Sequence, residues 1–150
     1  MSKLKMALYD QCQTIVANRH ASILNTISDI QESMASETKS TAGDKYETSR
    51  AMLQMEREKA GNQLAEIEKT MQLLSKLDPK RTLNYVSLGS IVYTSQLNYF
   101  ISVSIGQLII KKDLFYAVSI NSPIGELLKG KVEGDKIFFR DQELEITKVI

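Results

Sequence analysis

The first half of the chain repeats apolar residues at the spacing of a helix. Between residues 4 and 34 the intervals are three or four residues, and Arg19 fills the gap in the stripe. The members of the stripe are Leu4, Leu8, Cys12, Ile15, Ile23, Ile27, Ile30 and Met34. This pattern predicts one long amphipathic helix.

A second stripe with heptad spacing follows. Its seven-residue row consists of Tyr46, Leu53, Ala60, Ile67 and Leu74. Leu64 and Met71 interleave with this row four residues after the preceding member, which is typical of a coiled-coil seam. Arg50 and Arg57 occupy the interleaved row nearer its start, so the predicted seam becomes polar there.

Together the two stripes predict an antiparallel coiled-coil hairpin over residues 1–78, with its tip near residues 36–47. Each helix would contain about 32–34 residues and form a rod of about 50 Å at 1.5 Å per residue. Such a rod also fits a generic coiled-coil spacer or a dimerisation arm, and the pattern alone leaves these alternatives open.

The period changes in the second half of the chain. Short segments rich in Val, Ile, Tyr and Phe alternate with Gly, Asn, Lys and Asp, which is typical of strands and turns. The expected strands are Ser90–Thr94, Tyr99–Val103, Gln107–Ile110, Phe115–Ile120, Lys136–Phe139 and Glu143–Val149. One short helix is expected at Ser122–Leu128, with Ser122 as the N-cap, Pro123 at the first helical position and Gly130 after the end.

These elements predict an α+β protein in which the hairpin precedes a small antiparallel sheet with one helix. Both prolines and five of the seven glycines follow residue 78. The residue before a proline is driven out of the helical region, so we expect a helix end near Leu77 and a domain boundary at Asp78–Pro79. The predicted domains are therefore 1–78 and 79–150.

Composition narrows the class of protein only a little. With 25% charged and 43% hydrophobic residues, the composition is ordinary for a globular protein. The net charge of +1 is too small to attract nucleic acid or a membrane surface by itself. No apolar run approaches the ~18 residues of a membrane span, and no signal peptide is recognisable. With a single cysteine, a cytoplasmic location is expected.

Cys12 and His20 are the only cysteine and histidine of the chain. Eight residues apart on one helix, they would lie roughly 12 Å from each other. We therefore expect no nucleophile–base pair and no zinc site, and we expect Cys12 to be a small core residue.

The tip carries the candidate chemistry. Asp44 and Glu47 lie three residues apart in Gly43–Glu47, so their carboxylates could share a metal ion. The same pair has the form of a capping box with Asp44 at the N-cap, and acidic residues are favoured in a first helical turn. The residues alone leave both interpretations open.

The layout and two groups of motifs resemble the bacterial Gre transcript-cleavage factors (GreA/GreB). Ala42–Glu47 is similar to the family's Gly-Asp-x-x-Glu-Asn tip pattern. The matching stretches of the second half are Leu88–Val92, Ile120–Lys131, Gly134–Ile137 and Leu144–Val149. As an ordered set these stretches are fairly specific and span nearly all of residues 79–150.

This resemblance implies an FKBP-like C-terminal domain that docks on RNA polymerase and a coiled coil that enters the polymerase's secondary channel. It implies that Asp44 and Glu47 help to hold a second Mg²⁺ at the polymerase active site, where the 3′ end of backtracked RNA is cut. It further implies a docking surface at Ser122, Pro123, Ile124 and Gly125, together with Asp113. No independent enzymatic activity and no small-molecule substrate are expected, and RNA would be met only through the polymerase.

The tip also departs from the family. Thr48–Ala51 replaces the usual continuation after the glutamate, so an asparagine and a further acidic residue are lost. Lys45 stands between the two acids, and Arg50 follows one turn later. A non-catalytic regulator that occupies the same channel is therefore an alternative, and a coiled-coil adaptor unrelated to polymerase is a third.

Overall fold

A computed structural model describes residues 2–37 and 43–150, with the side chains of residues 3–36 and 48–150. Helices α1 (Ser2–Glu37) and α2 (Gly43–Ser75) form the predicted hairpin. The contacts divide the chain into two compact units, one of Val16–Lys69 and one of Met1–Ile15 with Thr70–Ile150. Because this division cuts across both helices, the domain boundary at Asp78–Pro79 stays a prediction.

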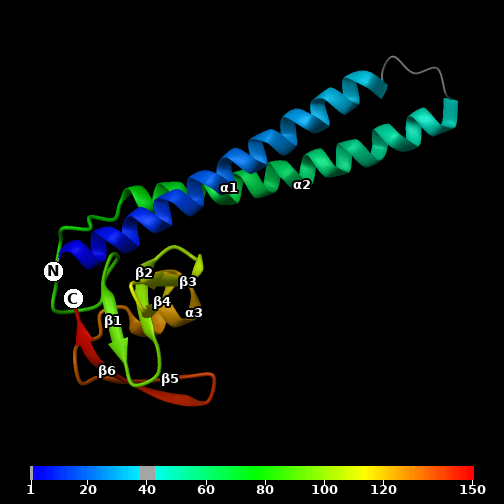
Figure 1. The fold of residues 1–150 in the computed structure, drawn as a ribbon. Helices are drawn as coiled ribbons and strands as arrows, with labels where there is room; N and C mark the ends of the chain where they lie inside the picture. The colour runs from blue at the N-terminus through cyan, green and yellow to red at the C-terminus, as the bar shows by residue number, and fades with distance from the viewer. Residues whose placement is uncertain (1, 38–42) are drawn as a thin grey trace. The chain divides into compact units, whose positions relative to one another are not determined.

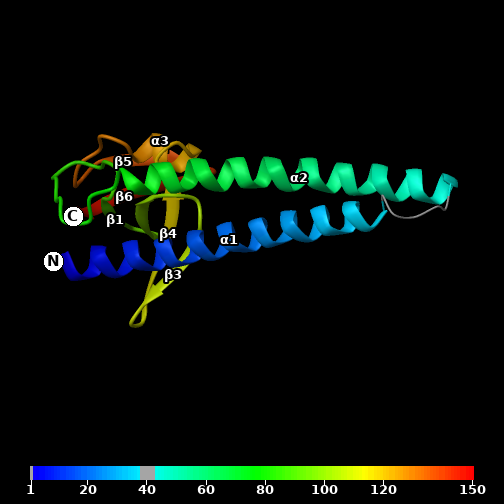
Figure 2. The same ribbon diagram turned by 90° about the horizontal axis from the view of Figure 1, so that it is seen from above.

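Within Val16–Lys69 the two helices lie side by side (Figures 1 and 2). Ile27 and Ile30 of α1 and Ala60 of α2 form its buried centre. The partly buried side chains packed against them are Ile23, Met34, Leu53 and Leu64. All of these residues belong to the two predicted stripes, so the apolar spacing identified this seam.

The stripes fail at some positions. Val16 is buried, whereas its neighbour Ile15, the predicted member, is only half-buried. Met71 was expected in the seam but is 37% exposed. An undistorted helix drifts by about 20° per heptad relative to a strict seven-residue repeat, so positions leave the seam over several turns.

Helix α2 ends shortly before the predicted Leu77. The amides of Lys76 and Leu77 donate to the carbonyl oxygens of Leu73 and Leu74, which tightens the chain into shorter-range bonds. Asp78 then accepts a 2.9 Å hydrogen bond from the amide of Lys80, which forms a turn around Pro79. The proline therefore marks the end of the helix as expected.

The remaining residues form a six-stranded sheet with the order β3-β4-β2-β1-β6-β5. The strands are β1 (Ile91–Thr94), β2 (Asn98–Ser102), β3 (Gly106–Ile110), β4 (Asp113–Ser119), β5 (Lys136–Phe139) and β6 (Gln142–Val149). The prediction of a wholly antiparallel sheet is wrong at one pair, since β2 and β4 run parallel. The chain forms the β3–β4 hairpin beyond β2, and β4 then returns into the place beside β2.

Both faces of β2 are buried. Tyr99 and Ile101 belong to an apolar cluster that also contains Ile124 and Leu128 of the short helix α3 (Pro123–Leu128). Successive side chains of a strand point to opposite faces, and the alternate residue Ser102 is buried next to Cys12 of α1. The sheet therefore lies between α3 on one face and the start of α1 on the other.

The start of α1 also covers one edge of the sheet. The side-chain amide of Gln11 donates a 3.1 Å hydrogen bond to the carbonyl oxygen of Ile109 on the edge strand β3. A free strand edge exposes unpaired backbone groups, so this contact protects β3.

Candidate functional site

The tip acids lie in the first turn of α2. The helix begins at Gly43, so both acids belong to its first turn, and the capping-box interpretation stays a prediction. Asp44 and Glu47 are three residues apart, which places their backbone positions about one turn apart. Their side chains lie outside the described residues, and the role of these acids as metal ligands stays a prediction.

Arg50 is the first charged residue after these acids whose side chain is described. It is half-buried, and its Nη1 donates a 3.4 Å hydrogen bond to the carbonyl oxygen of Met34 on α1. The guanidinium therefore joins the two helices near the tip, which gives this arginine of the seam a structural role. The side chain of Lys45 lies outside the described residues.

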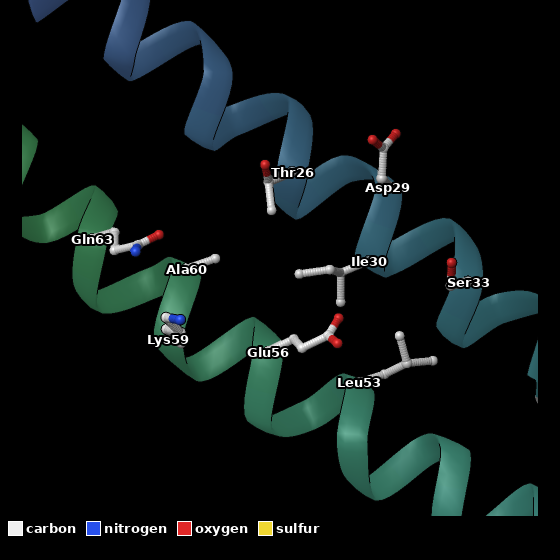
Figure 3. A pocket seen from close by; sticks show the side chains of 9 residues that line it. All are labelled: Thr26, Asp29, Ile30, Ser33, Leu53, Glu56, Lys59, Ala60 and Gln63. Carbon is white, nitrogen blue, oxygen red and sulfur yellow. The ribbon is translucent and has the colours of Figure 1, made fainter.

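A groove of about 540 Å³ lies between the helices of the hairpin (Figure 3). Its walls are Thr26, Asp29, Ile30 and Ser33 of α1 and Leu53, Glu56, Lys59, Ala60 and Gln63 of α2. Figure 3 shows Ile30 directed toward α2 and Glu56 directed toward α1. Ala60 is a small residue at a seam position, so the space between the helices follows from the local sequence.

A second cavity, of about 470 Å³, lies in the sheet domain beside the start of α3. It contains three of the predicted docking residues, Ser122, Pro123 and Ile124. The other lining residues are Ser104, Ile105, Gly106, Ala117, Val118, Phe139 and Arg140. We call these ten residues the α3 pocket. Its size and mainly apolar lining are typical of a binding site.

The N-terminus of α3 fixes the pocket wall. The Ser122 hydroxyl donates a 2.6 Å hydrogen bond to the carbonyl oxygen of Ser119 and accepts one of 3.1 Å from the amide of Gly125. Pro123 at the first helical position is exposed, whereas Ile124 is only 6% exposed. The predicted N-cap is confirmed, and of the predicted docking residues Ser122–Gly125 only Pro123 is exposed.

Gly125 serves the fold of this turn. A Cβ at this position would collide with the carbonyl oxygen of Ser119 and would lie 2.8 Å from that of Ile120. Only glycine therefore allows α3 to approach the end of β4 so closely. Gly125 is buried and lies outside the set that lines the α3 pocket.

Arg140 supplies the positive charge of the pocket. Its guanidinium carbon lies 5.0 Å from the centroid of the Phe139 ring, in a cation–π contact. Arg140 and Asp141 both have positive φ, 52° and 64°, and they form the two-residue turn between β5 and β6. This turn holds a cation beside an apolar cavity, an arrangement that favours an apolar ligand carrying a carboxylate.

Arg140 also acts on the buried phenol of Tyr99. Burial raises the pKa of Tyr99, the neighbouring Tyr116 raises it further, and the Arg140 charge partly opposes both effects. The net shift of the pKa is upward, so Tyr99 stays neutral, and its ring belongs to the apolar cluster on this side of the sheet.

Asp113 lies apart from the α3 pocket. It is the first residue of β4 and pairs with Ile110 across the β3–β4 turn, whereas Ser122 follows the other end of β4. A strand of this length spans about 20 Å at 3.3 Å per residue. The structure therefore does not bring Asp113 together with Ser122–Gly125, and a docking role of Asp113 would require a second contact with the partner.

Cys12 is a core residue, as expected. It is fully buried, and burial raises the pKa of its thiol from 9.0 to about 11, although the hydrogen bond with Ser102 opposes this shift. His20 lies with its Nε2 3.5 Å from a carboxylate oxygen of Glu68 in the hairpin. Among the residues whose placement is described, no three His, Cys, Asp or Glu side chains form a group that could hold a metal ion.

Sequence reasoning missed the far wall of the α3 pocket. Ile105 and Gly106 precede and begin β3, and Phe139 and Arg140 end β5 and begin its turn, so four separate segments meet at the cavity. Their meeting depends on the order of strands in the sheet, which no local pattern encodes. The only local signal was the strong turn propensity of Asp141, which predicts a turn but no partner.

No protein-family model matches the chain, and no curated protein matches it. Among solved structures, one described as the structure of the transcription factor Gfh1 is similar to 94% of this chain, over 92% of its own length. The identity is 16% and the TM-score 0.34, values that support no statement about function. In the described part of the chain, no helix is both long and apolar enough to cross a membrane.

Proposed function

We propose that this protein is an RNA polymerase-binding transcription factor that docks through the α3 pocket. The observation that carries this proposal is the place of Ser122, Pro123 and Ile124. These residues belong to the ordered motifs that resemble the Gre factors, and they line an apolar cavity of about 470 Å³ with Arg140. The expected contact on the polymerase is an aliphatic side chain with a carboxylate nearby.

The hairpin is the second part of the proposal. Helix α2 has 33 residues, so it is about 50 Å long at 1.5 Å per residue. A rod of this length suits the insertion into the secondary channel that the resemblance implies. The residues Ile27, Ile30 and Ala60 stiffen the rod by burying its seam, and Arg50 holds the two helices together near the tip.

We further propose that Asp44 and Glu47 stimulate cleavage of backtracked RNA by the polymerase. Mg²⁺ is commonly held by one or two carboxylates together with waters and phosphate oxygens, and the first turn of α2 offers two acids one turn apart. This donor set fits a metal shared with another protein and is too small for a site that this chain would fill alone. When bound, a second Mg²⁺ activates the attacking water or stabilises the leaving oxygen.

This chain's own part in the reaction is positional. In this proposal the hairpin brings the two carboxylates of Asp44 and Glu47 to the active centre. The cutting of the phosphodiester belongs to the polymerase, so the protein alone would have no activity on RNA.

The test is an assay of RNA cleavage in backtracked elongation complexes of the host polymerase with Mg²⁺. We expect shortened transcripts with the wild-type protein and a loss of at least about 100-fold in cleavage rate with Asp44→Asn/Glu47→Gln, as for other groups that stabilise developing charge. The matched control is Glu56→Gln on the shaft of α2, which should cleave like the wild type. Equal cleavage by the tip variant would contradict the catalytic proposal.

A non-catalytic regulator is the second candidate, and the observation that favours it is Arg50. Its guanidinium is fixed to the carbonyl oxygen of Met34 about one turn from Glu47, where a positive charge competes with a metal ion. This candidate predicts that the protein binds polymerase and alters initiation or pausing without shortening RNA. If purified polymerase is not bound at all, a coiled-coil adaptor function remains.

A further inference from the structure

Among the residues that the structure describes, no strand pairs with the outer edge of β5. It is the last strand in the order β3-β4-β2-β1-β6-β5, and Figure 1 shows it at the outer margin beyond β6. At the opposite edge, Gln11 occupies a carbonyl oxygen of β3. A side chain of α1 therefore bonds to the backbone of one edge strand, β3, whereas β5 forms the other edge of the sheet.

The outward backbone groups of β5 belong to Lys136 and Phe138. The amide of Ile146 donates to the carbonyl oxygen of Asp135, so residue 135 turns its backbone toward β6. Backbone direction alternates along an antiparallel strand, so Ile137 and Phe139 also face β6, while Lys136 and Phe138 face away from it. Their N–H and C=O groups form a template for another strand.

The side chains at this edge are unusual for a surface. Phe138 is 71% exposed, the highest value among the exposed large apolar side chains of the described residues. On the same face, the Lys136 ammonium lies 3.7 Å from a carboxylate oxygen of Glu143. An aromatic ring and a lysine thus stand two residues apart on one short strand.

We propose that β5 pairs antiparallel with β5 of a second copy of this chain, with Lys136 opposite Phe138 of the other copy. In this register all outward backbone groups of both residues are paired, because each two-fold-related Lys136–Phe138 pair exchanges both of its hydrogen bonds. Self-complementarity is what an isologous dimer requires.

The same register matches the side chains. Each lysine lies opposite a phenylalanine ring, which allows a cation–π contact, and Glu143 and Glu145 of the neighbouring strands flank the paired lysines. On the other face, Ile137 of one copy meets Ile137 of the other and continues the apolar cluster across the junction. Charge and apolar surface are both complementary in this arrangement, which is why a second copy is the proposed occupant.

The interface is small, so the dimer should form at high concentration. Sedimentation of the full chain from about 10 μM to about 1 mM should show the mass rising from monomer to dimer, as for a weak contact. Phe138→Ser should raise the dissociation constant about tenfold or more. The matched control is Ile109→Ser, since Ile109 is 59% exposed on the other edge strand. A monomer at all concentrations would overturn the proposal.

Disulfide trapping tests the register. The Cα atoms of Lys136 in one copy and Phe138 in the other would be about 5.5 Å apart, which a disulfide can span. The two copies of Lys136 would be offset by about two positions along the strands, too far for a disulfide, and the same holds for the two copies of Phe138. A mixture of Lys136→Cys and Phe138→Cys proteins should therefore cross-link, and each variant alone should not. The buried Cys12 does not interfere. Cross-linking of either variant alone, as efficient as that of the mixture, would overturn the proposal.

Discussion

The ammonium of Lys5 donates a 2.7 Å hydrogen bond to the carbonyl oxygen of Arg81. Lys5 is only 3% exposed and lies on α1, whereas Arg81 follows the end of α2. A buried charge is costly unless it is paired, and this contact supplies a partner for it. The start of the first helix is thus joined to the segment that leads into the sheet.

Lys5 should make stability depend on pH in the alkaline range. Burial lowers the pKa of Lys5 below 10.5, and the negative charge of Asp78 partly opposes this shift. Between the lowered pKa and 10.5 the unfolded chain binds the proton more tightly than the folded one, so this group makes the free energy of unfolding rise with pH. Urea unfolding at pH 7.5, 9 and 10 should show a less positive slope for Lys5→Met than for the wild type. Identical slopes would contradict the assignment.

Cys12 should resist alkylation in the folded protein. A rise in pKa from 9.0 to about 11 lowers the thiolate fraction about 100-fold at neutral pH, and burial adds a steric barrier. Iodoacetamide at pH 8 should therefore label Cys12 only as fast as the protein unfolds, and in urea at the rate of a free thiol. Rapid labelling of the native protein would show that the start of α1 does not cover Ser102 as described.

Gly125→Ala should destabilise the sheet domain. The added methyl group would collide with the carbonyl oxygen of Ser119, and backbone atoms cannot move aside as a flexible side chain can. We expect a loss of about 2–4 kcal/mol in the free energy of unfolding. Leu127→Ala, at an exposed residue of the same helix, serves as the control and should change stability by less than about 1 kcal/mol.

Gly61→Ala should raise the free energy of unfolding, in contrast to Gly125→Ala. Gly61 lies inside α2, and the nearest atom to an added Cβ is Nη1 of Arg57, 3.1 Å away at the free end of a flexible side chain. Alanine restricts the unfolded chain and favours the helix, so we expect a gain of about 0.5–1 kcal/mol. Thermal unfolding followed by circular dichroism measures this gain. A destabilised variant would show that the Arg57 side chain cannot move away from the added methyl group.

Local signals in the sequence predicted the elements of this fold well. The strands expected at Lys136–Phe139 and Glu143–Val149 appear at or within one residue of those bounds, and the Ser122–Pro123 start of α3 is confirmed. Turn, cap and alternation signals act over a few residues, so a single sequence contains them.

Non-local relationships could not be predicted in the same way. The parallel pairing of β2 with β4 and the meeting of Gly106 with Arg140 at the α3 pocket depend on how distant strands are ordered. Met71 shows the same limit inside a helix. Heptad spacing predicts which side chains face the partner helix, but the helix rotates slowly away from a strict seven-residue repeat, and Met71 is therefore partly exposed. The chemistry assigned to Asp44 and Glu47 depends on a partner, so it comes from a resemblance and from no pattern in this chain.

The most direct test of the account is the binding of purified host RNA polymerase to the α3 pocket, measured by fluorescence anisotropy of the labelled protein. Arg140→Glu reverses the charge of the pocket. Among the described residues the Arg140 side chain makes a cation–π contact with Phe139, and its charge lowers the pKa of Tyr99. Both effects are modest, so folding should be retained. We predict saturable binding by the wild type and an affinity at least about tenfold lower for Arg140→Glu, with Leu127→Ala unchanged. Absence of binding by the wild type, or equal affinity of Arg140→Glu, would contradict the proposal that this pocket docks on polymerase.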